Sequence, residues 1–160
     1  MTTRRRRSWK SRRERLAQVG WRQRALLAEA VVGLMVARMR ILTQPFRAIA
    51  RGMGEFVPPG DPRVAARRAP APEGQRIIAE QVGWAVTRAA DHVPFRAVCL
   101  PQAMAAHAML KRRGIPSAVH FGAQKGASKP IDAHAWLDAA GVEVTGYPMD
   151  EGLAEIGCFV

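Results

Sequence analysis

The feature that most constrains the fold is a change of hydrophobic periodicity at Gly114. Upstream of it, the sequence predicts a helix that begins at or just after Cys99, because Pro101 suits a first helical turn. Basic residues in the last turn, with Gly114 just beyond, are typical of a helix end. Downstream, a period of two predicts strands over Ala118–Phe121, Ala133–Asp138 and Val142–Tyr147. These patterns indicate an α+β fold, in which the cysteine-bearing helix packs on a short antiparallel sheet.

Two longer helices are predicted upstream. Arg22–Leu42 consists largely of good helix formers, and its wide apolar surface should pack against the rest of the protein. Glu73–His92 carries apolar residues at helical spacing. The other expected segments are a short helical turn at Phe46–Met53, a Pro-rich linker or surface wrap at Val57–Gly74, a short helical stretch at Glu151–Ile156 and an apolar tail at Cys158–Val160. We therefore expect a basic helical extension with its linker at residues 1–72 and a second domain at residues 73–160.

The positive charge is concentrated in the N-terminal third. The chain has 25 Lys and Arg against 13 Asp and Glu, a net charge of +12. Residues 1–51 hold 14 of the basic and 2 of the acidic groups, so the remaining 11 and 11 cancel. Residues 1–18 are interpreted either as a solvated tail or as a docking surface for an acidic partner or membrane. The apolar run Ala25–Ala37 is shorter than the roughly 20 residues that a spanning helix needs, and it does not match a signal peptide.

The cysteine and histidine content argues against disulfides and metal binding. The only cysteines, Cys99 and Cys158, indicate reduced thiols and a cytoplasmic location. There is no CxxC motif, and the histidines lack ligand spacing, so we expect no metal and no cofactor. The sequence also has no Gly-rich phosphate loop. Three side chains are expected to be packed or inert, namely those of His107, His120 and Cys158.

Two residues stand out as a nucleophile and its base. A thiol at a helix N-terminus lies in the positive end of the helix dipole, which favours the thiolate, and Cys99 has this placement. His134 lies on a predicted central strand and shares a face with Trp136, which suits a base that activates a thiol. The alternatives are that Cys99 is a small buried hydrophobe and that His134 is a hydrogen-bonded core histidine.

Several motifs together resemble a known family. The segments Cys99-Leu-Pro-Gln-Ala, Leu110–Pro116 and Ala133-His-Ala-Trp136 are similar to the transglutaminase-like cysteine peptidases that process lasso-peptide precursors. The resemblance extends from about Trp84 to the C-terminus, and more loosely over Ala25–Phe46. It implies a papain- or transglutaminase-like core with Cys99 as the nucleophile and His134 as the base. It also implies an oxyanion site formed by the Cys99 backbone N–H and Gln102.

The third catalytic position departs from the family pattern. The family places an Asp twelve residues after the histidine, where this chain has Gly146, preceded by Thr145. Asp138 is the least poor acidic candidate, although it lies about 13 Å along the strand from His134. The alternatives are a hydroxyl such as that of Thr145, a backbone carbonyl, or an acid from another segment, namely Glu143, Asp132 or Asp150.

The resemblance implies a leader peptidase that acts on a ribosomally made lasso-peptide precursor before macrolactam cyclisation. Its implied partners are the precursor leader, a separate leader-recognition protein and an ATP-dependent lasso cyclase, with membrane-surface contact through the basic N-terminus as a further option. Two alternatives keep the same site: acyl transfer of the transglutaminase or amidase type, and a degenerate scaffold without activity. Nucleic-acid binding is disfavoured, because the Arg-rich arm has few interleaved aromatic residues and the rest of the chain is neutral.

Overall fold

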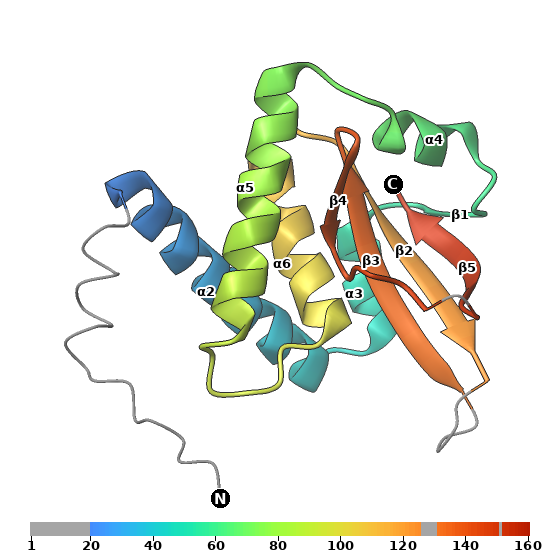
Figure 1. Ribbon diagram of the computed structural model, residues 1–160. Helices are drawn as coiled ribbons and strands as arrows, with labels where there is room; N and C mark the ends of the chain where they lie inside the picture. The colour runs from blue at the N-terminus through green and yellow to red at the C-terminus, as the bar shows by residue number, and fades with distance from the viewer. Residues whose placement is uncertain (1–19, 126–130, 151) are drawn as a thin grey trace, which may run out of the picture.

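The fold is known from a computed structural model that describes residues 20–125, 131–150 and 152–160. Three helices, α2 (Trp21–Thr43), α5 (Glu73–Ala90) and α6 (Cys99–Arg112), pack together on one face of a five-stranded antiparallel sheet (Figure 1). The expected α+β class is confirmed. The Arg-rich arm expected at residues 1–18 lies outside the described residues.

The sheet has the strand order β1-β5-β2-β3-β4. Its strands are β1 (Phe56–Val57), β2 (Ser117–Gln124), β3 (Asp132–Ala139), β4 (Val142–Thr145) and β5 (Ala154–Phe159). Because β4 and β5 lie on opposite sides of the β2–β3 pair, the connection between them must cross the sheet (Figure 1). We call the described part of this connection, residues 146–150 and 152–153, the crossover.

The cysteine-bearing helix and the strands that follow it agree with the sequence expectation. α6 begins at Cys99 and ends at Arg112. Gly114, two residues further on, has a φ of +66°, the left-handed conformation that glycine tolerates best. On β2 and β3, alternate residues such as Val119, Ala135 and Leu137 are buried in the main core with the helices. The next residues along each strand face the opposite side of the sheet.

Two expectations need correction. The stretch Glu151–Ile156 was expected to be helical, but β5 begins at Ala154 and takes in most of the expected apolar tail. Pairing of β5 with both β1 and β2 outweighs the helix preference of this short segment. The expected linker Val57–Gly74 contains a helix, α4 (Pro62–Arg68), which the Asp61 side chain caps by accepting a hydrogen bond from the Arg63 backbone N–H at 2.9 Å.

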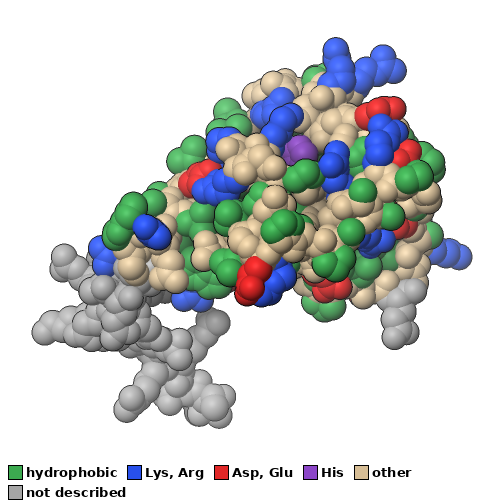
Figure 2. Space-filling view, turned by 90° about the horizontal axis from the view of Figure 1, so that it is seen from above, with side chains coloured by type: hydrophobic (Ala, Val, Ile, Leu, Met, Phe, Trp, Pro, Cys, Tyr) green, Lys and Arg blue, Asp and Glu red, His purple; other side chains and the backbone are tan. Residues whose placement is uncertain are grey.

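The two N-terminal helices, α2 and α3 (Phe46–Met53), contribute to the main core. Ala30, Leu34 and Ala37 of α2 are buried in the main core, next to α5 and α6, and α3 adds Ile49 and Met53. Glu29 of α2 binds Arg112 and Arg113 at the end of α6. Within the described residues, no helix is long and apolar enough to cross a membrane. On the face shown in Figure 2, basic side chains lie scattered among apolar ones.

Candidate active site

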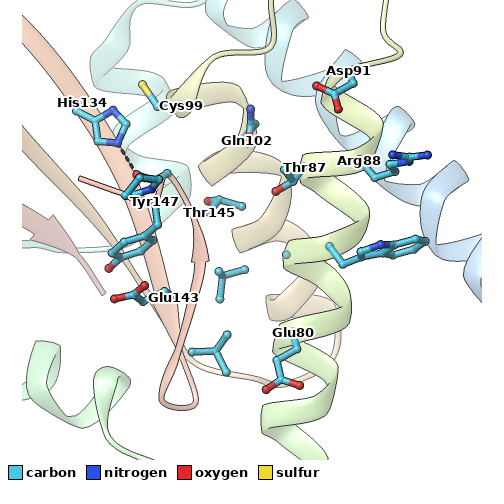
Figure 3. A pocket seen from close by; sticks show the side chains of 16 residues that line it. Glu80, Thr87, Arg88, Asp91, Cys99, Gln102, His134, Glu143, Thr145 and Tyr147 are labelled. Carbon is cyan, nitrogen blue, oxygen red and sulfur yellow. Dashed lines mark hydrogen bonds between the residues drawn. The ribbon is translucent and has the colours of Figure 1, made fainter. Parts of the chain in front are cut away.

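A pocket of about 820 Å³ lies where α5, the N-terminus of α6 and the edge strand β4 meet. Its walls come from α5 on one side and from β4 and the start of the crossover on the other, as Figure 3 shows. Cys99 and His134 both line it, so the structure brings the two predicted residues to one cavity. In Figure 3 they lie at the same end of the pocket, Cys99 on the α6 side and His134 on the β3 side.

Cys99 is the first residue of α6 and is partly exposed. No side chain caps this helix, since the preceding residue is Val98. The first-turn N–H groups are therefore not used by a capping side chain, and they create a positive potential beside the thiol. Among the described residues, the Cys99 thiol forms no hydrogen bond with His134, although both side chains lie at the same end of the pocket (Figure 3).

His134 is oriented by a backbone carbonyl. Its Nε2 lies 2.6 Å from the carbonyl oxygen of Gly146, twelve residues further along the chain. Because a carbonyl oxygen can only accept a hydrogen bond, Nε2 carries the proton in this contact. In the neutral imidazole, Nδ1 is then unprotonated and able to accept a proton from a thiol. This geometry fits the sequence alternative in which a carbonyl orients the histidine.

The glycine at position 146 is a steric requirement. Its φ is +86°, and an added Cβ would lie 2.6 Å from the carbonyl oxygen of Ala135 and 2.7 Å from the Cβ of Trp136. Any side chain here would push the crossover away from β3. The position that carries an acid in the resembled family therefore has no room for one, and its backbone oxygen contacts the histidine instead.

Comparison with known proteins gives one match. A model of the transglutaminase-like superfamily matches residues 34–156, which is most of the chain. The chain belongs to the transglutaminase-like superfamily. The match supports chemistry of the cysteine-peptidase or acyl-transfer kind, and it contains nothing specific to lasso-peptide processing. No curated protein and no solved structure gave a match.

Asp138 does not contact His134 in this transglutaminase-like chain. The four-residue separation along β3 places its carboxylate next to α4, where Arg68 Nε donates to Oδ2 at 2.6 Å. The hydroxyl of Tyr147, on the crossover, donates to Oδ1 at 2.5 Å. Burial alone would raise the pKa of Asp138, but the surrounding His120, Tyr147 and Arg68 keep it below its usual value. Asp138 thus fixes the residue that follows Gly146.

The other candidate orienters also lie away from His134. The Thr145 hydroxyl is buried and finds no hydrogen-bond partner among the described residues. Asp150 accepts a hydrogen bond from Gln124 at 3.1 Å, Asp132 is exposed at the start of β3, and Glu143 lies further down the pocket wall. None of these side chains is hydrogen-bonded to His134 in the described part of the chain.

Gln102 lines the pocket one turn beyond Cys99. One of its amide N–H groups donates to the Ala97 carbonyl oxygen at 2.7 Å, which ties α6 to the loop before it. A side-chain amide has two N–H groups, so a second donor remains for a substrate oxygen. The oxyanion role of Gln102 and of the Cys99 backbone N–H stays a prediction.

A second cysteine–histidine pair lies on the other face of the sheet, away from α2, α5 and α6 and on the side that α4 covers. His120 is fully buried and stacks on Trp136, with ring centroids 5.2 Å apart. Its Nδ1 contacts a Glu155 carboxylate oxygen and lies 3.2 Å from the Cys158 sulfur. Burial, reinforced by Glu155, raises the pKa of the Cys158 thiol to about 12. From the sequence, His120 and Cys158 are each predicted to be packed side chains, and their spacing gives no sign that they lie together.

Proposed function

We propose that this chain is a cysteine peptidase that removes the leader from a lasso-peptide precursor before macrolactam cyclisation. The observation that carries the proposal is the shared pocket of Cys99 and His134, with the histidine Nε2 held by the Gly146 carbonyl. Superfamily membership supports the chemistry, and the sequence motifs around both residues support the substrate class.

The proposed reaction follows from the two side chains. His134 Nδ1 accepts the Cys99 proton, and the thiolate attacks the carbonyl carbon at the leader–core junction. The N–H groups at the start of α6 stabilise the oxyanion. The imidazolium then protonates the leaving amine, which frees the core peptide and leaves the leader as a thioester. Water, activated by the same histidine, hydrolyses the thioester and restores the thiol.

The shape of the pocket suits an extended peptide. It runs from Cys99 between α5 and β4, past the half-exposed Trp84 and the charged side chains Arg88 and Glu143. An aromatic surface with charges of both signs can hold a segment of mixed composition. A peptide lying along this groove would present one carbonyl group to the thiol at its end.

The direct test combines the chain, its leader-recognition partner and the precursor, and follows a leader-length fragment by mass spectrometry. Cys99→Ala should abolish cleavage, a loss of at least about 10⁴-fold. His134→Gln should reduce it by roughly 10²–10⁴-fold. His92→Gln is the matched control, because His92 is exposed and outside the pocket, and it should cleave normally. Cleavage by the Cys99→Ala protein would refute the assignment.

Two further assays separate the alternative chemistries. Incorporation of an amine into a glutamine substrate, without peptide cleavage, would assign transglutaminase-type transfer from the same thiol. A Cys99 thiol that reacts with iodoacetamide no faster than a free cysteine at pH 7 would indicate a scaffold without activity.

We propose the partners that go with this function: the precursor leader, a separate leader-recognition protein and an ATP-dependent lasso cyclase, all in the cytoplasm. The outward side of α2 supports a protein contact, since five of its apolar side chains are more than half exposed, namely Trp21, Val32, Val36, Met39 and Leu42. Deleting residues 1–18 should leave Cys99 reactive and weaken binding to a partner or membrane surface. Unchanged affinity for every partner and for anionic vesicles would contradict a docking role.

A further inference from the structure

The buried pair on the second sheet face has the composition of a metal site. Three donor atoms converge there: Nδ1 of His120, Sγ of Cys158 and a carboxylate oxygen of Glu155, all within 4.8 Å of one another. The sulfur lies 3.2 Å from Nδ1 and 3.0 Å from the carboxylate oxygen. Imidazole, thiolate and carboxylate are the donor types that proteins use for zinc.

A β-bulge brings these donors together. His120 of β2 lies directly opposite Cys158 of β5, so their side chains share a face. Glu155 is three residues before Cys158 and would point to the opposite face of a regular strand. The pairing shifts by one residue between Phe121 and Gly122, which leaves Ile156 unpaired and turns Glu155 toward His120. Such bulges commonly re-aim a side chain at a site.

The surroundings support a bound cation. Metal-binding histidines usually direct their other ring nitrogen at a carboxylate. Here Nε2 of His120 lies 3.2 Å from Oδ2 of Asp138, close enough for an ion pair though not aligned for a hydrogen bond. Arg68 and Tyr147 fix that carboxylate from the other side. The charge of Arg68 offsets that of Asp138, so a dication would balance the Glu155 carboxylate and the Cys158 thiolate.

We propose that His120, Glu155 and Cys158 bind a zinc-class divalent metal ion with three protein ligands, separate from the Cys99 pocket. Binding releases the Cys158 thiol proton to solvent and takes His120 as neutral imidazole. Tetrahedral zinc separates its ligand atoms by about 3.3–3.6 Å, given bonds of about 2.0–2.3 Å. The partly exposed Glu155 side chain therefore moves outward slightly and leaves a fourth position for water. The ion would join β5 to β2 beneath the crossover.

The test uses the full chain carrying Cys99→Ala, reduced, stripped with a chelator and titrated with Co²⁺. The chain has two cysteines, so any thiolate-to-cobalt charge-transfer band in this protein comes from Cys158. We expect that band together with visible d–d absorption, saturating at one equivalent, and loss of both when Zn²⁺ displaces Co²⁺. Zn²⁺ should also raise the melting temperature.

Ligand variants on the same background decide the assignment. Cys158→Ser should remove the charge-transfer band, and Glu155→Gln should keep it, while each weakens binding by about 100-fold or more. His92→Gln should change neither the band nor the affinity, because His92 is exposed and is not one of the three converging donors. Circular dichroism checks folding, and Glu155→Gln, an isosteric change at a partly exposed residue, serves if Cys158→Ser does not fold. Absence of stoichiometric binding, or binding without the band, would overturn the proposal. Because every protein here lacks the Cys99 thiol, the outcome does not depend on the proposed peptidase activity.

Discussion

The two cysteine–histidine pairs of this chain occupy very different surroundings. Cys99 is partly exposed at a helix start and faces a pocket, whereas Cys158 is fully buried in a strand beside a carboxylate. Both histidines stack on Trp136, with ring centroids 5.2 Å away for His120 and 6.1 Å for His134. The difference teaches that residue type alone does not make a nucleophile. The solvent exposure of the sulfur and the electrostatic potential around it decide which thiol can act as a nucleophile.

The largest expected contrast between the pairs is in thiol reactivity. With iodoacetamide on the native, metal-free protein near pH 7, Cys99 should be alkylated at least about 100-fold faster than Cys158. Burial shields the Cys158 sulfur, and its raised pKa of about 12 keeps it protonated. Peptide mapping by mass spectrometry measures both rates, and in denaturant the two should become similar. Faster native modification of Cys158 would reverse the comparison.

The second-largest expected effect comes from displacing the Gly146 carbonyl that orients His134. Gly146→Ala places a Cβ against Ala135 and Trp136 at a positive φ, so the crossover shifts and His134 loses its acceptor. We expect cleavage to fall by roughly 10²–10⁴-fold, as when a catalytic histidine loses its orienting group, and stability to fall by about 1–3 kcal/mol. Gly74→Ala is the control, since Gly74 lies in α5 with open space around it. Equal losses in both variants would contradict a specific role for Gly146.

A third histidine sharpens the comparison because its only hydrogen-bond partner in the described part of the chain is a hydroxyl, with no cysteine or acid. His107 contacts the Ser117 hydroxyl at 2.9 Å, and burial, helped by Lys111, lowers its pKa from 6.5 to about 4. As the pH falls, His107 therefore becomes protonated in the unfolded chain at a higher pH than in the folded chain. Stability from this group is present above pH 6.5 and is lost between pH 6.5 and 4, by roughly 3 kcal/mol.

Urea unfolding as a function of pH measures that loss. His107→Gln should remove the decline assigned to this group, whereas His92→Gln, at an exposed site, should leave it in place. An unchanged slope in the His107→Gln protein would show that another group causes it.

The smallest expected effect concerns Tyr147, which connects the two cysteine–histidine pairs through Asp138 beside His120 and through Gly146 beside His134. Tyr147→Phe removes the hydroxyl that binds Asp138 and so loosens the residue next to the Gly146 carbonyl. Losing a hydrogen bond to a buried carboxylate should cost about 1–3 kcal/mol in urea unfolding. Cleavage should fall by about tenfold through kcat, with KM little changed, because the hydroxyl donates its hydrogen bond to Asp138. A fall through KM alone would instead assign Tyr147 to substrate binding.

The parts of the fold that were predictable have local causes. The span of α6 follows from Pro101 near its start and Gly114 after its end, and β2–β4 follow from alternation. β5 was missed because its first residues are reasonable helix formers, and only pairing with β1 and β2 makes them a strand. The short helix α4 left a readable signal, Asp61 followed by Pro62, within a stretch dominated by prolines.

The residues of the site also divide into those with a local sequence signal and those that depend on tertiary structure. Cys99 and His134 could be named because each sits in a recognisable local motif. The acceptor for His134 could not be named, because a backbone carbonyl carries no residue-specific signal and its direction depends on the crossover. The cluster of His120, Glu155 and Cys158 depends on a one-residue shift in strand pairing, which the spacing of the residues conceals.

The contact between His134 and the Gly146 carbonyl has a consequence for acid tolerance. A carboxylate that orients a histidine gains a proton in acid and then stops acting as a pure acceptor, whereas an amide carbonyl keeps its acceptor character across the range in which proteins stay folded. The lower limb of this chain's pH–rate profile should therefore report the cysteine and histidine alone. The tautomer of the base is fixed by a group that no side-chain substitution can delete, only displace.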